Sequence, residues 1–146
     1  MKLGIVGSEA RKFTPETEAI ARTQIDALIL NYGADLVISG HSPLGGIDWW
    51  AVEEARKLGV EVLEFPAATS DWEHGFKPRN LQIAGESDIV ACVVVKELPP
   101  SYRGRRFPQG CYHCHTPPGD HVKSGGCWTM KQANRLGKPT ELVVVW

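Results

Sequence analysis

The amino-acid sequence predicts an α/β fold: one doubly wound domain over residues 1–146, built on a five-stranded parallel sheet in the order 3-2-1-4-5. Two observations support this prediction. Short apolar runs alternate along the chain with stretches whose apolar residues recur at helical spacing, which is typical of successive βαβ units. The run IVACVVV at 89–95 is uniformly apolar, as expected for a central strand that helices cover on both faces.

Strands and helices are expected to alternate. The strands are predicted at 2–8, 36–38, 60–65, 89–95 and 142–145. The first helix starts at Pro15 with Thr14 as its N-cap, and Gly33 ends it. The third helix starts at Pro78, and the fourth follows Gly125-Gly126. The buried faces of the first three helices are expected to carry Ile20, Ala21, Ile25, Leu28 and Ile29, then Ile47, Trp50, Ala51, Ala55 and Leu58, then Leu81, Ile83 and Ala84.

The composition is that of an ordinary soluble globular domain, with 42% apolar and 23% charged residues in 146. A formal charge of −1 argues against general affinity for polyanions or membrane surfaces, and no apolar run approaches the ~20 residues of a membrane span. Met1-Lys2 leads directly into an apolar strand, so we expect no signal peptide and a cytoplasmic location. In that reducing compartment the four cysteines are expected as thiols or metal ligands, not as disulfides.

The turn between the second strand and the second helix has the composition of an anion site. It contains Ser39-Gly40 and Gly45-Gly46. A strand, a glycine-rich turn and a helix start direct backbone N–H groups and the positive end of the helix dipole at one point, which favours a phosphate-bearing ligand. A tight turn that needs glycine and binds nothing is the alternative.

Three side chains near this edge of the sheet have two roles open to them. Arg79 either binds a phosphate or carboxylate, or forms a surface ion pair. Asp48 either caps the second helix or acts as a catalytic carboxylate. Trp49 either stacks on a base or lies at the subunit interface of a homo-oligomer.

Four segments occur in an order that resembles the SLOG superfamily: GIVGSEARKF, VISGHSPLGGIDWWAVEEARKLGVEVLEFPA, KPRNLQIAGESDIVACV and GGCWTMKQANRLGKPTELVVV. This Rossmann-like group includes DprA-type, LOG-type and YspA-type proteins, and the similarity is closest to the YspA type, which is often found in bacteria and phages. The matching positions are Gly7, Ser8, Gly40, Gly45, Asp48, Pro78, Arg79, Asn80, Gly125 and Gly126. The resemblance implies that these residues, Pro78 apart, bind a nucleotide or nucleotide-derived ligand at the carboxyl rim of the sheet. It also implies a sensor or binding module of phage or mobile-element origin.

One motif departs from the hydrolases of this superfamily. LOG-type enzymes carry GGxGTxxE, whereas this chain has Trp128 at the third glycine and Gln132 at the glutamate. Glutamine cannot accept a proton as a carboxylate does, so the resemblance favours binding over hydrolysis. The alternative function is that of a nucleotide N-glycosidase or phosphoribohydrolase, with Asp48, Glu53 or Glu86 as the catalytic carboxylate.

An insertion at 96–124 interrupts the alternation and contains a cysteine and histidine motif, C-x2-C-x6-H-x5-C. The spacing resembles a zinc knuckle and predicts one Zn²⁺ ion held by Cys111, Cys114, His121 and Cys127, with His113 and His115 as alternative ligands. A redox-active C-x2-C pair and thiols without a role are the alternatives. Cys92 is expected to be a buried apolar residue.

The same insertion combines basic and aromatic residues and is expected to cover the rim of the sheet. These are Arg103, Arg105 and Arg106, with Tyr102, Phe107 and Tyr112 among them. Arginines and aromatic rings in this pattern bind the backbone and stack on the bases of single-stranded nucleic acid, which is a further alternative function. A solvated loop has the same composition, so this alternative also stays open.

Overall fold

The computed structural model describes residues 1–114 and 120–146, and it contains the predicted sheet. Five parallel strands lie in the order β3-β2-β1-β4-β5, so the predicted fold class is confirmed, strand order included. The strands are β1 (Lys2–Gly7), β2 (Leu36–Ser39), β3 (Glu61–Glu64), β4 (Ile89–Val95) and β5 (Thr140–Val145). The helices are α1 (Pro15–Tyr32), α2 (Ile47–Lys57), α3 (Lys77–Glu86) and α4 (Gly125–Arg135), with a single π-helical turn at Trp72–Phe76.

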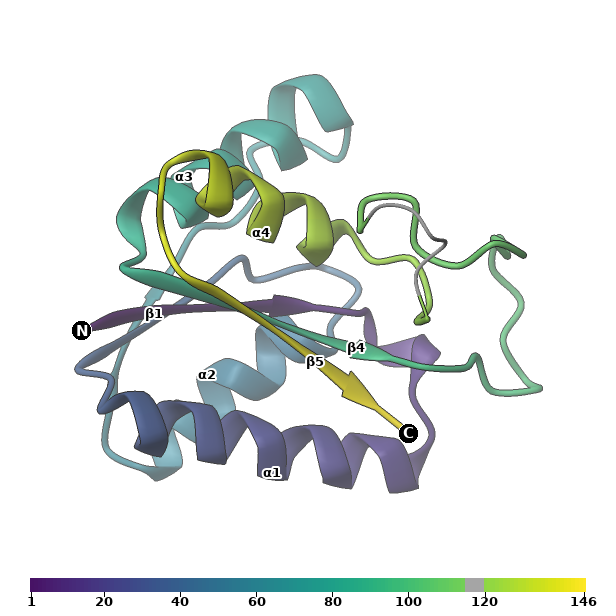
Figure 1. Ribbon diagram of the computed structural model, residues 1–146, viewed down its shortest axis with the longest axis horizontal. Coiled ribbons are helices and arrows are strands. Elements are labelled where there is room, and N and C mark those ends of the chain that lie inside the picture. Colours follow the sequence, from purple (N-terminus) through teal and green to yellow (C-terminus); the bar gives the residue numbers. More distant parts are fainter. Residues whose placement is uncertain (115–119) are drawn as a thin grey trace.

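The helices form two layers around the sheet. Figure 1 shows α1 and α2 on one face and α3 and α4 on the other. Each interface has its own core: one cluster joins the sheet to α1 and α2, and a second joins it to α3 and α4. Every residue of β4 is buried, as its uniformly apolar sequence predicts for a central strand.

The ends of α1 follow from local sequence. The Thr14 hydroxyl accepts a hydrogen bond from the backbone N–H of Thr17 at 3.1 Å, and the Thr17 hydroxyl accepts from the N–H of Thr14 at 2.8 Å. This reciprocal capping box, with Pro15 in the first turn, starts the helix at the predicted residue. Gly33 ends the helix in the left-handed conformation, with φ of 60°.

Three of the side chains predicted to be buried are exposed. Ile20 and Leu81 are each 43% exposed, and Leu58 is 38% exposed. Successive helical residues are about 100° apart around the axis, so a residue next to the inward stripe turns towards solvent. Leu58 follows the last residue of α2 and lies outside the packed helix.

The carboxyl ends of the strands meet at one edge of the sheet, and the insertion covers that edge. In Figure 1 the arrows of β1, β4 and β5 point towards the segment that joins β4 to α4. The described parts of that segment, 96–114 and 120–124, contain no helix or strand. A long irregular segment at this edge of a doubly wound sheet is positioned to take part in a ligand site.

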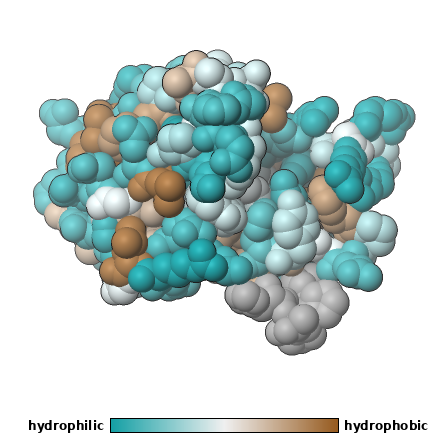
Figure 2. Space-filling model, turned by 90° about the horizontal axis from the view of Figure 1, so that it is seen from above, coloured by the Kyte–Doolittle hydropathy of each residue, from teal (hydrophilic) through white to brown (hydrophobic). Residues whose placement is uncertain are grey.

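On the face that carries α3 and α4, hydrophobic side chains form small separate patches among hydrophilic ones (Figure 2). Among the helices of the described residues, none combines the length and the apolar content needed to cross a bilayer.

Candidate functional site

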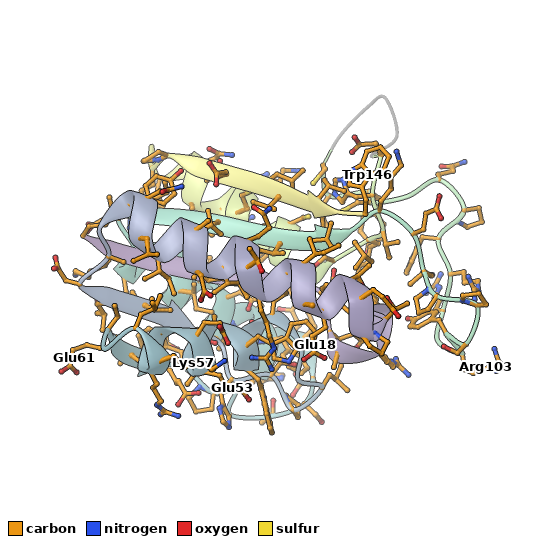
Figure 3. The ribbon with its side chains drawn as sticks, turned by 90° about the horizontal axis from the view of Figure 1, so that it is seen from below. Glu18, Glu53, Lys57, Glu61, Arg103 and Trp146 are labelled. Carbon is orange, nitrogen blue, oxygen red and sulfur yellow. The ribbon has the colours of Figure 1, made fainter. Side chains whose placement is uncertain are left out.

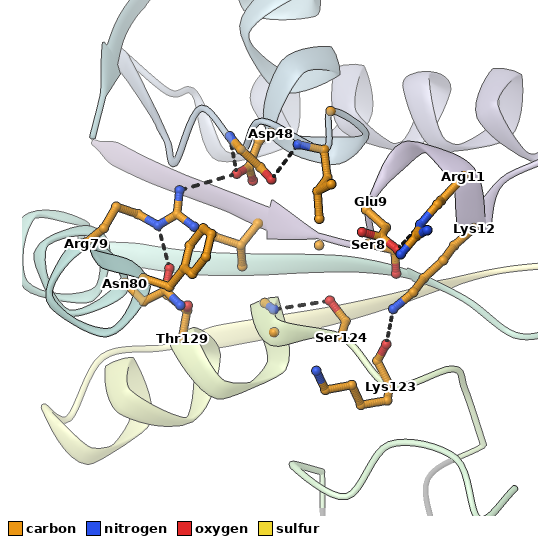
Figure 4. A pocket seen from close by; sticks show the side chains of 18 of the residues that line it. Ser8, Glu9, Arg11, Lys12, Asp48, Arg79, Asn80, Lys123, Ser124 and Thr129 are labelled. Carbon is orange, nitrogen blue, oxygen red and sulfur yellow. Dashed lines mark hydrogen bonds and ion pairs between the residues drawn. The ribbon is translucent and has the colours of Figure 1, made fainter. Parts of the chain in front are cut away.

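A cavity of about 380 Å³ lies at the carboxyl edge of the sheet, between the end of β1, the turn before α2 and the start of α4 (Figure 4). The predicted ligand residues Gly7, Ser8, Gly45, Asp48, Arg79, Asn80, Gly125 and Gly126 all line it. Gly40 does not line it, although it supports one wall. The order of short motifs in the sequence therefore corresponds to one hollow in the structure.

The Arg79 side chain forms part of that wall and is 7% exposed. Its Nη1 donates to the carbonyl of Gly40, and its Nε donates to Asn80 Oδ1 at 2.7 Å. The same Nη1 lies 3.8 Å from Asp48 Oδ2, and the guanidinium carbon lies 5.3 Å from the centre of the Phe76 ring. These contacts fix the guanidinium at the edge of the cavity, so Arg79 has a structural role whether or not it also binds a ligand.

Asp48 has features of both roles that its sequence leaves open. It lies in the first turn of α2 and accepts a hydrogen bond from the backbone N–H of Ser42 at 3.1 Å, which closes the glycine-rich turn. Burial raises the pKa of Asp48 to about 6, although the nearby Arg79 opposes this rise. Glycine at position 40 leaves room for the side chains of Arg79 and Asp48, because a Cβ there would contact the guanidinium and lie 2.9 Å from Asp48 Oδ2.

The opposite wall is formed by Ser8 and the first turn of α4. Ser8 is 2% exposed, and its Oγ has no hydrogen-bond partner among the described residues. Gly126 allows α4 to approach β1 closely, since a Cβ on it would lie 2.7 Å from the backbone nitrogen of Gly7. A buried hydroxyl without a partner, beside the positive end of a helix, is suited to donate to an anion.

Basic side chains complete the cavity, and the sequence analysis did not assign most of them to it. Arg11, Lys12, Arg105 and Lys123 line it. The Lys12 ammonium donates to the carbonyl of Lys123 at 2.8 Å and so joins the segment after β1 to the segment before α4 (Figure 4). Arg11 and Lys12 belong to a short 3-10 helix at Ala10–Lys12, soon after the end of β1. This position at the carboxyl edge was the available signal.

The three candidate carboxylates lie in different places. Asp48 lines the cavity, as does Glu9, which pairs with Arg11 at 2.8 Å. Glu53 is on the α1–α2 face, near Glu18 and Lys57 (Figure 3), and pairs with Arg22 at 2.7 Å. Glu86 lies 3.8 Å from the ammonium of Lys2, at the first residues of β1. Neither Glu53 nor Glu86 lines the cavity.

Trp128 replaces the third glycine of the LOG-type motif, and its contacts explain a tryptophan there. Its ring packs edge-on against that of Trp72, with the ring centres 4.8 Å apart. Trp72 in turn lines the cavity. Gln132, at the position of the motif's glutamate, accepts from Arg135 at 3.4 Å in an exposed contact. Trp128 thus packs beside the cavity, and α4, whose sequence contains no Asp or Glu, brings no carboxylate to it.

The insertion is anchored to α4 by a group of three cysteines and one histidine. The ligand atoms of Cys111, Cys114, His121 and Cys127 all lie within 4.8 Å of one another. A tetrahedral zinc ion with ordinary bond lengths separates sulfur and nitrogen ligands by about 3.6 Å, and Cys127 Sγ lies 3.6 Å from His121 Nε2. His113 does not join this group, and His115 lies outside the described residues.

The surroundings of the group are suited to a metal ion. His121 Nδ1 lies 3.1 Å from Asp120 Oδ1, which orients the ring so that Nε2 faces the cysteines. Hydrogen bonding with Cys127, and then with the backbone at Ser124 and His113, lowers the pKa of Cys111 to about 4. Burial raises the pKa of Cys114 to about 11. A bound dication favours the thiolate form of the cysteines that ligate it.

The fourth cysteine and the exposed tryptophan lie beside these sites. Cys92 is fully buried in β4, as predicted, and its Sγ lies 3.8 Å from that of Cys127. Trp49 is 44% exposed, stacks on His41 with ring centres 5.6 Å apart, and donates to the carbonyl of Ser42 at 2.6 Å. Neither side chain is part of the cavity or of the cysteine–histidine group.

Fold and site together define a Rossmann-like α/β protein with a cavity at the carboxyl edge of its sheet. Solved structures with the same fold include the molybdenum cofactor carrier protein MCP from Chlamydomonas reinhardtii, with a TM-score of 0.59 and 14% identity over 97% of this chain and 74% of that chain. They also include DNA processing protein A from Helicobacter pylori, described with a single-stranded DNA binding mode. Its TM-score is 0.54, with 17% identity over 97% of this chain and 64% of that chain. At such identities the similarity shows the fold alone.

Comparison at the level of sequence adds no relative. No known protein family matches the chain, and a search of curated proteins returned no match.

Proposed function

We propose that this protein binds a nucleotide or nucleotide-derived ligand in the cavity at the carboxyl edge, as a sensor or binding module of the SLOG type. The observation that carries the proposal concerns Ser8, a buried residue that lines the cavity and is 2% exposed. Its Oγ has no hydrogen-bond partner among the described residues. An anionic ligand supplies the missing acceptor.

The charges around Ser8 support a phosphate group at this point. Lys12, Arg105 and Lys123 line the cavity on the same side as the start of α4. The chain as a whole has a formal charge of −1, so these cations reflect a local concentration and not a basic composition. The rings of Trp72 and Phe76, which also line the cavity, offer apolar surface for a base. The cavity thus offers contacts for both a phosphate and a base.

Zinc, in this proposal, holds the insertion in place over the cavity. Three cysteines and a histidine form a closed donor set that suits structural zinc, with protein ligands in all four positions. The insertion contributes Tyr102, Arg105 and Phe107 to the cavity, while Cys127 is in the first turn of α4. The metal therefore acts on ligand binding indirectly, by positioning these side chains.

The function is tested by isothermal titration calorimetry of the zinc-loaded protein. The probes are the nucleoside 5′-monophosphates of the four common bases, each paired with its nucleoside. We expect at least one monophosphate to bind and its nucleoside to bind about tenfold more weakly or not at all, since a charge-assisted hydrogen bond is lost. Lys123→Gln should lower the affinity for the monophosphate. Lys131→Gln should leave this affinity unchanged, because Lys131 is on α4 but outside the cavity. Equal affinity for nucleoside and monophosphate would contradict the proposal.

A further inference from the structure

Beside the ligand cavity lies a second, larger cavity beneath the insertion, with a volume of about 720 Å³. We propose that the two cavities form one groove and that the ligand carries a second phosphate group, as a 5′-phosphorylated dinucleotide does. This inference rests on the proposed function, because it assigns the first phosphate and its base to the cavity at Ser8. It adds a binding site formed by the insertion and names the class of ligand.

The two cavities share a wall. Lys12, Arg105, Phe107 and Lys123 line both of them. Lys12 bonds to the carbonyl of Lys123 at 2.8 Å, so these two lysines are held together at the junction. A ligand that extends past this pair passes from one cavity into the other without leaving the basic surface.

The second cavity is basic and partly aromatic. It adds Lys96 and Arg106 to the three cations of the shared wall, and its acidic members are Glu97 and Asp120. Asp120 is already bonded to His121, and Glu97 is exposed to solvent. Among the described residues, five cations thus line this cavity against two carboxylates, which leaves an excess of positive charge. One of the five, the Lys96 ammonium, also lies 3.4 Å from the centre of the Trp146 ring.

Two cations lie close to the shared aromatic ring. The Arg105 guanidinium lies 4.9 Å from the centre of the Phe107 ring, and the Lys123 ammonium lies 5.6 Å from it. Arg106 is fixed by a hydrogen bond from its Nη2 to the carbonyl of Tyr102 at 3.1 Å. An aromatic ring beside cations combines apolar surface for a base with phosphate contacts, which is the arrangement that linked nucleotides require.

The size of the first cavity also favours a longer ligand. At about 380 Å³ it is at the small end of the range of roughly 300–1,000 Å³ found for ligand sites. A dinucleotide needs more room than this, and the second cavity provides it along a continuous wall.

The experiment compares a nucleoside 5′-monophosphate with the 5′-phosphorylated dinucleotide of the same base, titrated into the zinc-loaded protein. We expect the dinucleotide to bind at least about tenfold more tightly, because it gains a second charge-assisted contact. Arg106→Gln should remove most of this gain and leave monophosphate affinity unchanged, since Arg106 lines only the second cavity. Arg103→Gln is the matched control: Arg103 projects from the insertion (Figure 3) and lines neither cavity.

The outcomes separate this inference from the function on which it rests. Equal affinity for the two probes, or equal losses in Arg106→Gln and Arg103→Gln, would overturn the groove while leaving monophosphate binding intact. A protein that binds neither probe refutes the proposed function itself. Zinc content and the thermal unfolding midpoint of each variant, expected to match the parent, verify that the insertion remains folded.

Discussion

Replacing Ser8 by alanine should weaken ligand binding without destabilising the protein. The Ser8 side chain is buried, and its Oγ has no hydrogen-bond partner among the described residues. A buried hydroxyl left without a partner costs about 1–3 kcal/mol, so removing it should leave the free energy of unfolding unchanged or raise it by up to about 1 kcal/mol. A hydrogen bond to a charged ligand is worth about 1.5–3 kcal/mol, so affinity for the nucleoside monophosphate should fall about 10- to 100-fold.

Ser87→Ala is the matched control for this substitution. Ser87 is equally buried, at 1% exposure, but its Oγ donates to the carbonyl of Ile83 at 2.7 Å and it precedes β4 at the other edge of the sheet. Its loss should lower the free energy of unfolding by about 1 kcal/mol and leave ligand affinity unchanged. The two serines therefore predict opposite patterns in the same pair of measurements, urea denaturation and calorimetry.

The reasoning about Ser8 fails under either of two results. A loss of more than about 1 kcal/mol of stability in Ser8→Ala means that the hydroxyl has a partner within the folded protein. Unchanged affinity for the monophosphate means that the hydroxyl does not donate to the ligand, and the observation that carries the proposed function is then lost.

Three further predictions concern the metal, the turn before α2 and the buried carboxyl. Elemental analysis should find one zinc per chain in the parent and in Cys92→Ala but none in Cys114→Ser, and zinc in Cys114→Ser would contradict this. The circular dichroism of Cys114→Ser should match that of the parent, because the described parts of the insertion contain no helix or strand. In urea denaturation, Gly46→Ala should lower the free energy of unfolding by about 1–3 kcal/mol more than Gly45→Ala does. Both glycines have positive φ, but only at Gly46 would a Cβ lie 2.5 Å from a backbone atom, the nitrogen of Ala10, and equal losses in the two variants would contradict this reasoning. Burial raises the pKa of Asp48 to about 6, so its carboxyl stabilises the fold most below pH 4, and this stabilisation is lost as the pH rises to 6. In denaturation at pH 4 and pH 7, Asp48→Asn should reduce the fall in the free energy of unfolding between these pH values by about 3 kcal/mol, and an equal fall in parent and variant would refute this.

Much of the fold could be predicted because it depends on local patterns. The apolar run of β4 and the Thr14 cap of α1 require only neighbouring residues to be understood, and both appear as expected. The order of the strands follows from their alternation with helices, since right-handed crossovers leave few arrangements. The prediction of which helix residues face inward was less accurate, as the exposed Ile20 and Leu81 illustrate. The width of the buried stripe depends on the elements that pack against the helix.

The candidate site was predictable where glycines and cysteines mark it and not where cations complete it. Where two backbone segments approach closely the sequence has a glycine, as at Gly126. Metal ligands can be recognised by their spacing, as in the segment from Cys111 to Cys127. A lysine or arginine in a cavity has no such sequence signal, because most lysines and arginines are solvated at the surface. Arg79, expected as a ligand contact or a surface ion pair, proves to be buried against Gly40 and Asp48.

The sequence by itself determined the strand segments, the ends of α1 and the spacing of the cysteine and histidine residues, since each depends on residues close together in the chain. The tertiary structure decided that Lys12 and Lys123, 111 positions apart, lie on one wall, and that Ser8 is buried without a partner. It also decided that the insertion forms a second cavity against this wall. The physical reason is that contacts between distant residues depend on how the helices and strands pack. This packing depends on the whole chain, so it cannot be predicted from any one segment.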